Sequence, residues 1–157
     1  MTNRTQHEVG HRLDAAAAAC LHSGARLTPL RRDLLALVLA AEGPATAYQL
    51  LERLRATHPG AAPPTVYRTL DFLLAQRLIH RVERLNAFVA CSEAEQHDHA
   101  ASFLICGRCG TVAELEDHDL SEAVRGAARH AGFRPSAATV EIEGLCAQCV
   151  QAGPARA

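Results

Sequence analysis

Apolar residues recur every three or four positions through the first half of the chain, which is the spacing of one buried helix face. This spacing predicts four helices, over residues 7–23, 30–40, 46–57 and 66–76. Glycine and proline residues close the first three, at Gly24, at 43–44 and at 58–60, because both residue types interrupt helical backbone. We therefore expect a helical first half.

Two of the helix starts carry capping signals. Thr28 precedes Pro29, and proline is favoured at the first helical position because its missing N–H needs no partner there. Thr46 is followed three residues later by Gln49, the spacing of a capping box in which each side chain accepts a hydrogen bond from the other residue's backbone N–H. These signals place the beginnings of the second and third helices.

A hairpin is predicted after the fourth helix. Residues 78–84 alternate apolar and polar side chains, residues 85–87 form a turn, and residues 88–91 return. The preceding helix turns Tyr67 and Arg68 outward. Short helices followed by a hairpin are the layout of a winged helix, in which the helix before the hairpin enters the major groove of DNA. A small helical domain that ends in a hairpin is the alternative.

The pattern changes in the second half of the chain. Strand-like segments cover residues 102–105, 111–115 and 139–142, and a helix is predicted over 120–131. Such a small α+β unit has too small a core to be stable alone, so we expect a metal or a second chain to supplement it.

Charge is distributed unevenly between the two halves. The 157 residues carry 16 Lys+Arg and 17 Asp+Glu, a formal net charge of −1, which by itself argues against a nucleic-acid partner. Residues 1–85 hold 11 Arg and 7 acidic residues, whereas residues 86–157 hold 5 Arg and 10 acidic residues. The net charges of the two parts are therefore +4 and −5, and the positive part coincides with the predicted winged helix.

The sequence gives no sign of a membrane segment. No apolar run approaches the roughly 20 residues that a spanning helix needs. Residues 1–12 lack the apolar core and cleavage site of a signal peptide. We therefore expect a cytoplasmic protein with no membrane partner.

Two C-x-x-C pairs, one near the middle of the second half and one near its end, suggest a metal site. Four thiolates on two tight turns make a tetrahedral sulfur shell, the preferred environment of structural Zn²⁺. Two disulfides, which a reducing cytoplasm disfavours, and a redox C-x-x-C are the alternatives. The candidate structural zinc ligands are Cys106, Cys109, Cys146 and Cys149.

A second, less regular set of metal-ligating residue types surrounds the first cysteine pair. Imidazole, thiolate and carboxylate ligands together also suit zinc. Taken singly, each has an ordinary structural explanation, such as a surface strand residue or a small buried side chain. The members of this set are His80, Cys91, His97, His99 and Glu114.

An enzyme is not expected. The pattern at 91–93 and 106–109 superficially matches the zinc deaminases, with Glu93 as acid/base. However, no proline precedes Cys106 and the second cysteine pair would have no role. A thiol redox sensor or zinc store remains as an alternative of the binding class, although neither would need Tyr67 and Arg68 on an exposed helix.

Together these residues resemble the ferric uptake regulator (Fur) superfamily. The likeness rests on Thr65-Val66-Tyr67-Arg68-Thr69-Leu70, Leu78-Ile79-His80, His97-x-His99 and Phe103-Leu104-Ile105-Cys106-x-x-Cys109-Gly110-x-Val112-x-Glu114, and it extends from about Arg12 to Cys149. Cys91 and the segment 103–106 make the chain most similar to the zinc uptake regulator (Zur) branch. Cys91 also counts against iron and peroxide sensors, because a soft ligand does not suit their iron sites.

The resemblance implies an α+β protein in which a winged helix precedes a small α/β dimerisation domain with a four-cysteine zinc site. The predicted division is a DNA-binding domain at 1–85, a hinge at 86–92, a dimerisation and metal-binding domain at 93–150 and a flexible tail at 151–157.

The resemblance also implies a function. A zinc-loaded homodimer is expected to bind palindromic operator DNA and repress zinc-uptake genes, with about two zinc ions per chain and no small-molecule substrate other than zinc. A regulator of the same superfamily that senses iron, manganese or peroxide is the alternative. The regulatory zinc ligands it implies are His80, Cys91, His99 and Glu114, with His97 as a further candidate, and the DNA-contacting residues are Arg68, Tyr67, Thr65 and Tyr48.

Overall fold

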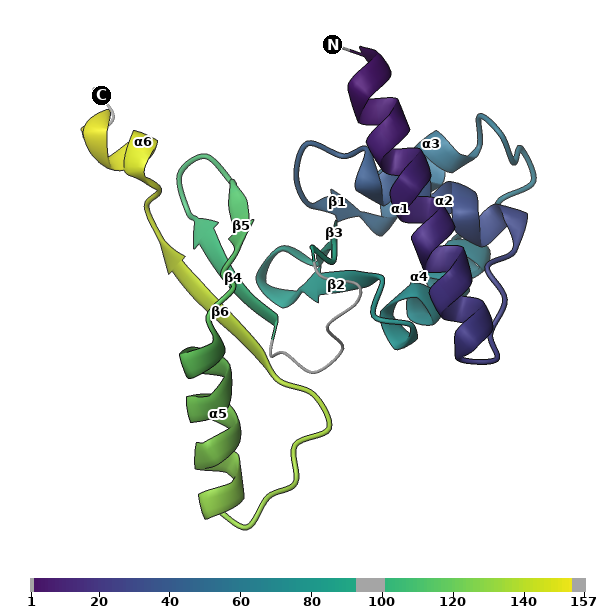
Figure 1. Cartoon of the computed structure of the whole chain (residues 1–157). Coiled ribbons are helices and arrows are strands. Elements are labelled where there is room, and N and C mark those ends of the chain that lie inside the picture. The colour runs from purple at the N-terminus through teal and green to yellow at the C-terminus, as the bar shows by residue number, and fades with distance from the viewer. Residues whose placement is uncertain (1, 93–100, 154–157) are drawn as a thin grey trace. The chain divides into compact units, whose positions relative to one another are not determined.

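The computed structural model describes residues 2–92 and 101–153. By its internal contacts the chain forms two compact units, Met1–Glu95 and Gln96–Ala157. Along the first unit the order is four helices interleaved with short strands (Figure 1). Its elements are α1 (Thr2–His22), α2 (Pro29–Leu39), β1 (Ala45–Thr46), α3 (Ala47–Leu54), α4 (Pro63–Ala75), β2 (Ile79–Val82), the 3-10 turn η1 (Glu83–Leu85) and β3 (Ala87–Ala90).

The core of the first unit is made by the inner faces of its helices and the hairpin. Leu34, Leu50, Leu54 and Leu73 are fully buried in it. Burial of each such side chain contributes about 1.5–3 kcal/mol, so packing alone supplies a large stabilisation. The helices and the hairpin that follows them confirm the predicted winged-helix layout.

A third strand completes the hairpin's sheet. The order is β1-β3-β2, all antiparallel, with Ala45 opposite Phe88 and Thr46 opposite Ala87. β1 was not predicted, because a strand of two residues carries no detectable alternation. The turn of the hairpin is η1, and Asn86 directly after it is in the left-handed region (φ 46°).

The two predicted helix starts differ in how they are capped. Thr46 and Gln49 form the predicted capping box, with the Gln49 N–H donating to the Thr46 hydroxyl and the Thr46 N–H donating to the Gln49 side chain. Thr28 stands at the N-cap of α2 but its side chain makes no cap hydrogen bond. The beginning of α2 is therefore marked in the sequence by Pro29 and not by a side-chain cap.

The second unit is a three-stranded sheet with one long helix. Its elements are β4 (Ala101–Cys106), β5 (Val112–Glu114), α5 (His118–His130), β6 (Thr139–Gly144) and α6 (Ala147–Gln151). β5 pairs antiparallel with one side of β4, and β6 pairs parallel with the other. A parallel pair needs a long crossover, and α5 lies within it. The predicted strands and helix are present, whereas α6 was not predicted.

The boundary between the two units, as their internal contacts define it, lies further along the chain than residue 85. β3 occupies residues 87–90 of the predicted hinge and pairs with β1 and β2 of the first unit. The contacts divide the chain at 95/96. The hinge and its bounds stay a prediction. Among the described residues no helix is long and apolar enough to cross a membrane.

Candidate metal centre and nucleic-acid interface

The two cysteine pairs meet at one edge of the second unit's sheet. Cys106 ends β4 and is in register with Gly144, which ends β6. Because the strands run parallel, their carboxyl ends lie side by side, and the chain leaving each strand carries one C-x-x-C pair. The pairing of β4 with β6 therefore brings Cys109 and Cys146 together, although 36 residues separate them in the sequence.

The sulfur positions fit a tetrahedral metal site rather than disulfides. The four Sγ atoms all lie within 4.8 Å of one another, and those of Cys109 and Cys146 are 3.7 Å apart. A disulfide would require about 2.05 Å. Zn–S bonds of about 2.3 Å place the corners of a tetrahedron about 3.8 Å apart. The spacing of this pair is therefore that of two ligands on one zinc ion.

Backbone hydrogen bonds shape the first cysteine turn. The Cys106 N–H donates to Thr111 O, and the Gly110 N–H donates back to Cys106 O, both at 2.9 Å. Gly110 has φ +73°, a conformation that glycine adopts without strain. The Gly107 N–H donates to Gly144 O at 2.9 Å, which ties the first turn to the end of β6.

The electrostatics of the cysteines favour a cation among them. Backbone N–H groups of Cys109, Cys146 and Arg108 lower the pKa of Cys106 to about 6. The Thr111 hydroxyl, 3.1 Å from Cys109 Sγ, lowers the pKa of Cys109. Burial, followed by the neighbouring thiols, raises the pKa of Cys149 to about 12. A metal ion beside Cys149 would favour its thiolate, and metal binding would release its proton.

Arg108 fastens the C-terminal helix to the cysteine turn. Its Nη1 donates to the carbonyl oxygens of Cys149 and Gly153, at 2.5 and 2.6 Å. Carbonyl groups at a helix end lack partners within the helix, and an arginine there satisfies them. This role of Arg108 was not predicted, because nothing in a C-x-x-C pattern indicates which way a side chain between the cysteines points.

His80 and Cys91 of the second candidate set share one face of the hairpin. β2 and β3 pair so that His80 is opposite Val89, and the Cys91 N–H donates to Leu78 O. His80 and Cys91 are thus diagonal neighbours on one side of the sheet. Their ligand atoms lie within 4.8 Å of each other, and Cys91 is buried.

The remaining members of that set belong to the second unit. Glu114 ends β5 and lies opposite Phe103 of β4. His97 and His99 lie outside the described residues. The chemistry of the set, imidazole, thiolate and carboxylate, fits zinc. The regulatory ligand set stays a prediction.

The candidate DNA-reading residues lie on exposed parts of α3 and α4. Tyr67 is 55% exposed and Tyr48 67% exposed, and Arg68 is also exposed. Thr65 is half-buried near the beginning of α4. Val66, Thr69, Leu70 and Leu73 hold the opposite face of α4 in the core. The helix therefore presents an aromatic ring and a guanidinium outward from a fixed support.

Comparison with known proteins agrees with this architecture. Residues 22–143 match the Ferric uptake regulator family. The chain is 40% identical over 139 residues to the Zinc uptake regulation protein of Escherichia coli (strain K12), covering 88% of this chain and 81% of that protein. The chain belongs to the ferric uptake regulator family.

Two solved structures of this family extend the likeness to both units. A zinc uptake regulator complexed with zinc and DNA is 39% identical, covers 92% of this chain and 96% of its own, and superposes with a TM-score of 0.85. Holo XcZur is 45% identical, with coverages of 88% and 96% and a TM-score of 0.80. The predicted family, its zinc uptake regulator branch and the α+β fold are confirmed.

Two arginines of this family member have contacts that sequence reasoning did not anticipate. Arg12 of α1 donates through Nη2 to the carbonyl oxygen of Cys91. Arg31 of α2 lies over the ring of Phe72 with 3.6 Å between the guanidinium carbon and the ring centroid. Both contacts join residues that are far apart in sequence, so no local sequence pattern predicts them.

Proposed function

We propose that the chain is a zinc-responsive transcriptional repressor that binds operator DNA as a homodimer. Its likeness over both units to a zinc uptake regulator complexed with zinc and DNA is the observation that carries this proposal. The proposal includes repression of zinc-uptake genes and a cytoplasmic location. The proposal assigns the chain no catalytic activity.

Two zinc ions per chain are part of the proposal. The first is structural and is held by Cys106, Cys109, Cys146 and Cys149, whose sulfur spacing fits it. It neutralises the four thiolates and links β4 to the chain that leaves β6. This ion belongs to the fold and is not expected to exchange during regulation.

The second zinc ion is the signal. Its proposed ligands are His80, Cys91, His99 and Glu114, with His97 as the alternative imidazole. His80 and Cys91 belong to the first unit, whereas the other ligands belong to the second. Chelation by ligands from both units would restrict the angle between them. Zinc then selects one arrangement of the units from a population instead of building either of them.

Dimerisation gives that restriction its effect on DNA. In a twofold dimer the arrangement of the units sets the distance between the two α4 helices, and only one distance matches two half-sites on DNA. Coupling between the sites is reciprocal, so operator DNA tightens the binding of the regulatory zinc by the same factor by which zinc tightens DNA binding.

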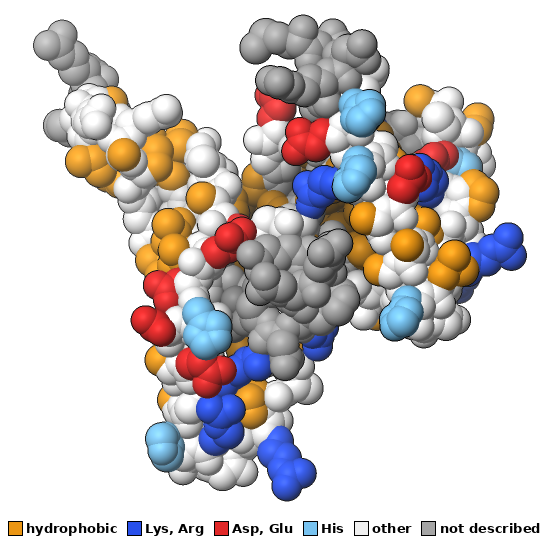
Figure 2. All heavy atoms as spheres, viewed as in Figure 1, with side chains coloured by type: hydrophobic (Ala, Val, Ile, Leu, Met, Phe, Trp, Pro, Cys, Tyr) orange, Lys and Arg blue, Asp and Glu red, His pale blue; other side chains and the backbone are white. Residues whose placement is uncertain are grey.

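An apolar surface supports the proposed homodimer. Leu104 is 41% exposed and Ile142 44% exposed on neighbouring strands of the second unit, and Leu145 follows β6. Apolar side chains gather over this sheet and α6 in Figure 2. Leu104 and Ile142 border a hollow of about 380 Å³. A second copy of the chain would cover this surface, which a lone unit leaves in water.

Arg68 is proposed to read a guanine through two hydrogen bonds in the major groove. Tyr67 contacts a thymine methyl or a phosphate, and Thr65 and Tyr48 add contacts from the beginning of α4 and from α3. The exposure of Arg68, Tyr67 and Tyr48 and the buried opposite face of α4 support these roles. Their positions in the first unit agree with its positive net charge.

A gel shift with and without a zinc chelator tests the proposal. Wild-type protein is expected to lose binding to its operator after mild chelation, to keep one zinc ion per chain, and to regain binding when zinc is restored. Recovery with ferrous iron or manganese but not with zinc would identify another metal sensor. Absence of operator binding under every metal condition would reject the repressor.

The variant Cys91→Ser distinguishes the proposed regulatory zinc site from the structural one. This variant is expected to keep the structural zinc and the fold but to lose zinc-dependent operator binding. Cys20→Ser is the matched control, because Cys20 is buried in the same unit and is not among the proposed ligands. Zinc-dependent binding by Cys91→Ser equal to that of wild type would remove Cys91 from the site.

A further inference from the structure

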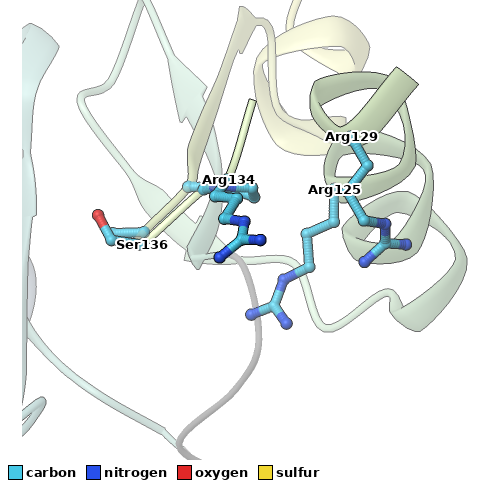
Figure 3. A pocket seen from close by; sticks show the side chains of 7 residues that line it. Arg125, Arg129, Arg134 and Ser136 are labelled. Carbon is cyan, nitrogen blue, oxygen red and sulfur yellow. The ribbon is translucent and has the colours of Figure 1, made fainter. Parts of the chain in front are cut away.

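Three of the five arginines in the second unit line one cavity. Arg125 and Arg129 come from α5, and Arg134 comes from the segment between α5 and β6. The cavity has a volume of about 270 Å³ and is completed by the backbone and small side chains of residues 135–138. Figure 3 shows the side chains of Arg125 and Arg134 extending into the same space, with Arg129 beside them on the helix.

The charges around this cavity are unusual for the unit that contains it. Acidic residues outnumber arginines in 96–157, yet none of the described residues that line the cavity is acidic. Arg129 is paired with Glu122 at 3.5 Å, and both side chains are more than half exposed. Arg134 makes no hydrogen bond or ion pair with any residue that the structure describes. Guanidinium groups facing one small space repel one another, and an anion between them removes that repulsion.

We propose that this cavity is a binding site for a small phosphate-bearing molecule. Guanidinium groups are planar forks that donate two parallel hydrogen bonds to phosphate oxygens, and Arg is therefore the favoured side chain for phosphate recognition. Arg134 supplies one such group from the segment after α5, and Arg125 and Arg129 add positive charge from the helix. The Ser136 side chain points away from the arginines, so it is not among the ligand contacts.

The size of the cavity narrows the ligand class. Sites for drug-sized ligands occupy roughly 300–1,000 Å³, and this cavity lies just below that range. It therefore suits pyrophosphate or the phosphate groups of a small organic phosphate, with any organic part extending out of the opening. Bound there, such a ligand would link α5 to the segment that leads to β6.

The site is independent of the proposed zinc and DNA functions. None of its lining residues belongs to the cysteine cluster, to the proposed regulatory ligands or to α4. Its arginines also lie within a single unit, so the cavity does not depend on how the two units are arranged. Failure of zinc-dependent repression would leave this proposal intact, and the reverse is equally true.

Calorimetric titration of the full-length zinc-loaded protein with pyrophosphate, in phosphate-free buffer, tests the proposal. Arg134→Ala is expected to weaken binding about tenfold or more, and Arg125→Ala combined with Arg134→Ala to abolish it. Arg134→Lys keeps the charge but loses the fork, so its affinity should fall between those of wild type and Arg134→Ala. Arg26→Ala removes one exposed arginine from the other unit and should bind pyrophosphate as wild type does.

Zinc content and helicity of each variant show whether the fold is intact. Unmeasurable binding of pyrophosphate to wild type at millimolar concentration would overturn the proposal. So would equal affinities of wild type and Arg134→Ala. A third contrary result is weaker operator binding by Arg134→Ala with unchanged pyrophosphate affinity, because it would assign the arginines to DNA phosphates.

Discussion

The two units of the chain have different amounts of buried apolar surface. In the first unit the inner faces of four helices and a hairpin meet in one continuous core, which includes Leu34, Leu50 and Leu73. In the described part of the second unit, Phe103 and Ile105 are the only large buried apolar side chains. The second unit places its cysteines at the edge of its sheet and leaves Leu104 and Ile142 partly in water.

This difference indicates what each unit needs in order to fold. Buried apolar area offsets the conformational entropy of the first unit, as it does in ordinary small domains. A unit the size of the second, with so few buried side chains, needs a metal, a partner or both. The proposed zinc ion and the proposed dimer are therefore also the expected sources of its stability.

Cys106→Ser should have the largest effect and should act on one unit. Losing one of four thiolates removes the tetrahedral shell, and structural zinc sites contribute folding free energy directly. The second unit is expected to lose its protection against hydrogen exchange, a change on the order of 5 kcal/mol or more. Exchange measured by mass spectrometry on peptides from both units checks this, together with zinc content.

Peptides from α2, α3 and α4 should remain protected in Cys106→Ser. Cys20→Ala is the control, because it also removes a buried thiol but lies in the first unit. It should leave zinc content unchanged. If Cys106→Ser unfolds both units together, the first unit is not stable by its own packing and the contrast between them fails.

Leu73→Ala is expected to destabilise the first unit and to leave the second unit unaffected. Leu73 is fully buried on α4, so truncation should destabilise the first unit by about 2–5 kcal/mol, as cavity-forming core substitutions do. Leu104→Ala, at a partly exposed position of the second unit, should change unfolding much less but should weaken dimerisation. Denaturant unfolding and analytical ultracentrifugation separate the two effects. Similar losses of unfolding free energy would show that the units share one core.

The first unit could be predicted from sequence because its signals are local. The capping box of Thr46 and Gln49 and the glycine and proline stops lie within a few residues of the boundaries that they specify. The spacing of Val66, Leu70 and Leu73 indicates which face of α4 is buried. β1 was missed because its two residues are held by pairing with β3, which lies about 40 positions away.

The second unit was less predictable because its contacts are not local. Spacing alone paired the cysteines into a metal site, but the register of β4 with β6 that brings them together is set by pairing across the sheet. The hydrogen bonds from Arg108 to the end of α6 have no local signature either. The same holds for the convergence of Arg125 and Arg134 on one cavity.

Arg68→Ala tests whether DNA recognition belongs to the first unit. Removing an exposed guanidinium from α4 should weaken binding to the operator by about 1–3 kcal/mol and relax specificity at one base pair. Zinc content and stability of both units should not change. Fluorescence anisotropy with operator and with scrambled DNA measures the effect. Arg31→Ala removes a guanidinium packed on Phe72 and should instead lower stability. An unchanged ratio of the two affinities in Arg68→Ala would place specificity elsewhere.

Thr46→Ala is expected to have the smallest effect and to be confined to the first unit. The Thr46 hydroxyl accepts a hydrogen bond from the Gln49 N–H, so its loss leaves one N–H of α3 unsatisfied and costs about 1 kcal/mol. Thr28→Ala is a matched control, since Thr28 occupies the same position of α2 without a side-chain cap. It should cost less in denaturant unfolding of the zinc-loaded protein. If both variants lose the same unfolding free energy, the capping box adds nothing beyond the backbone pairing of β1, and the local signal that best predicted this unit is not what stabilises it.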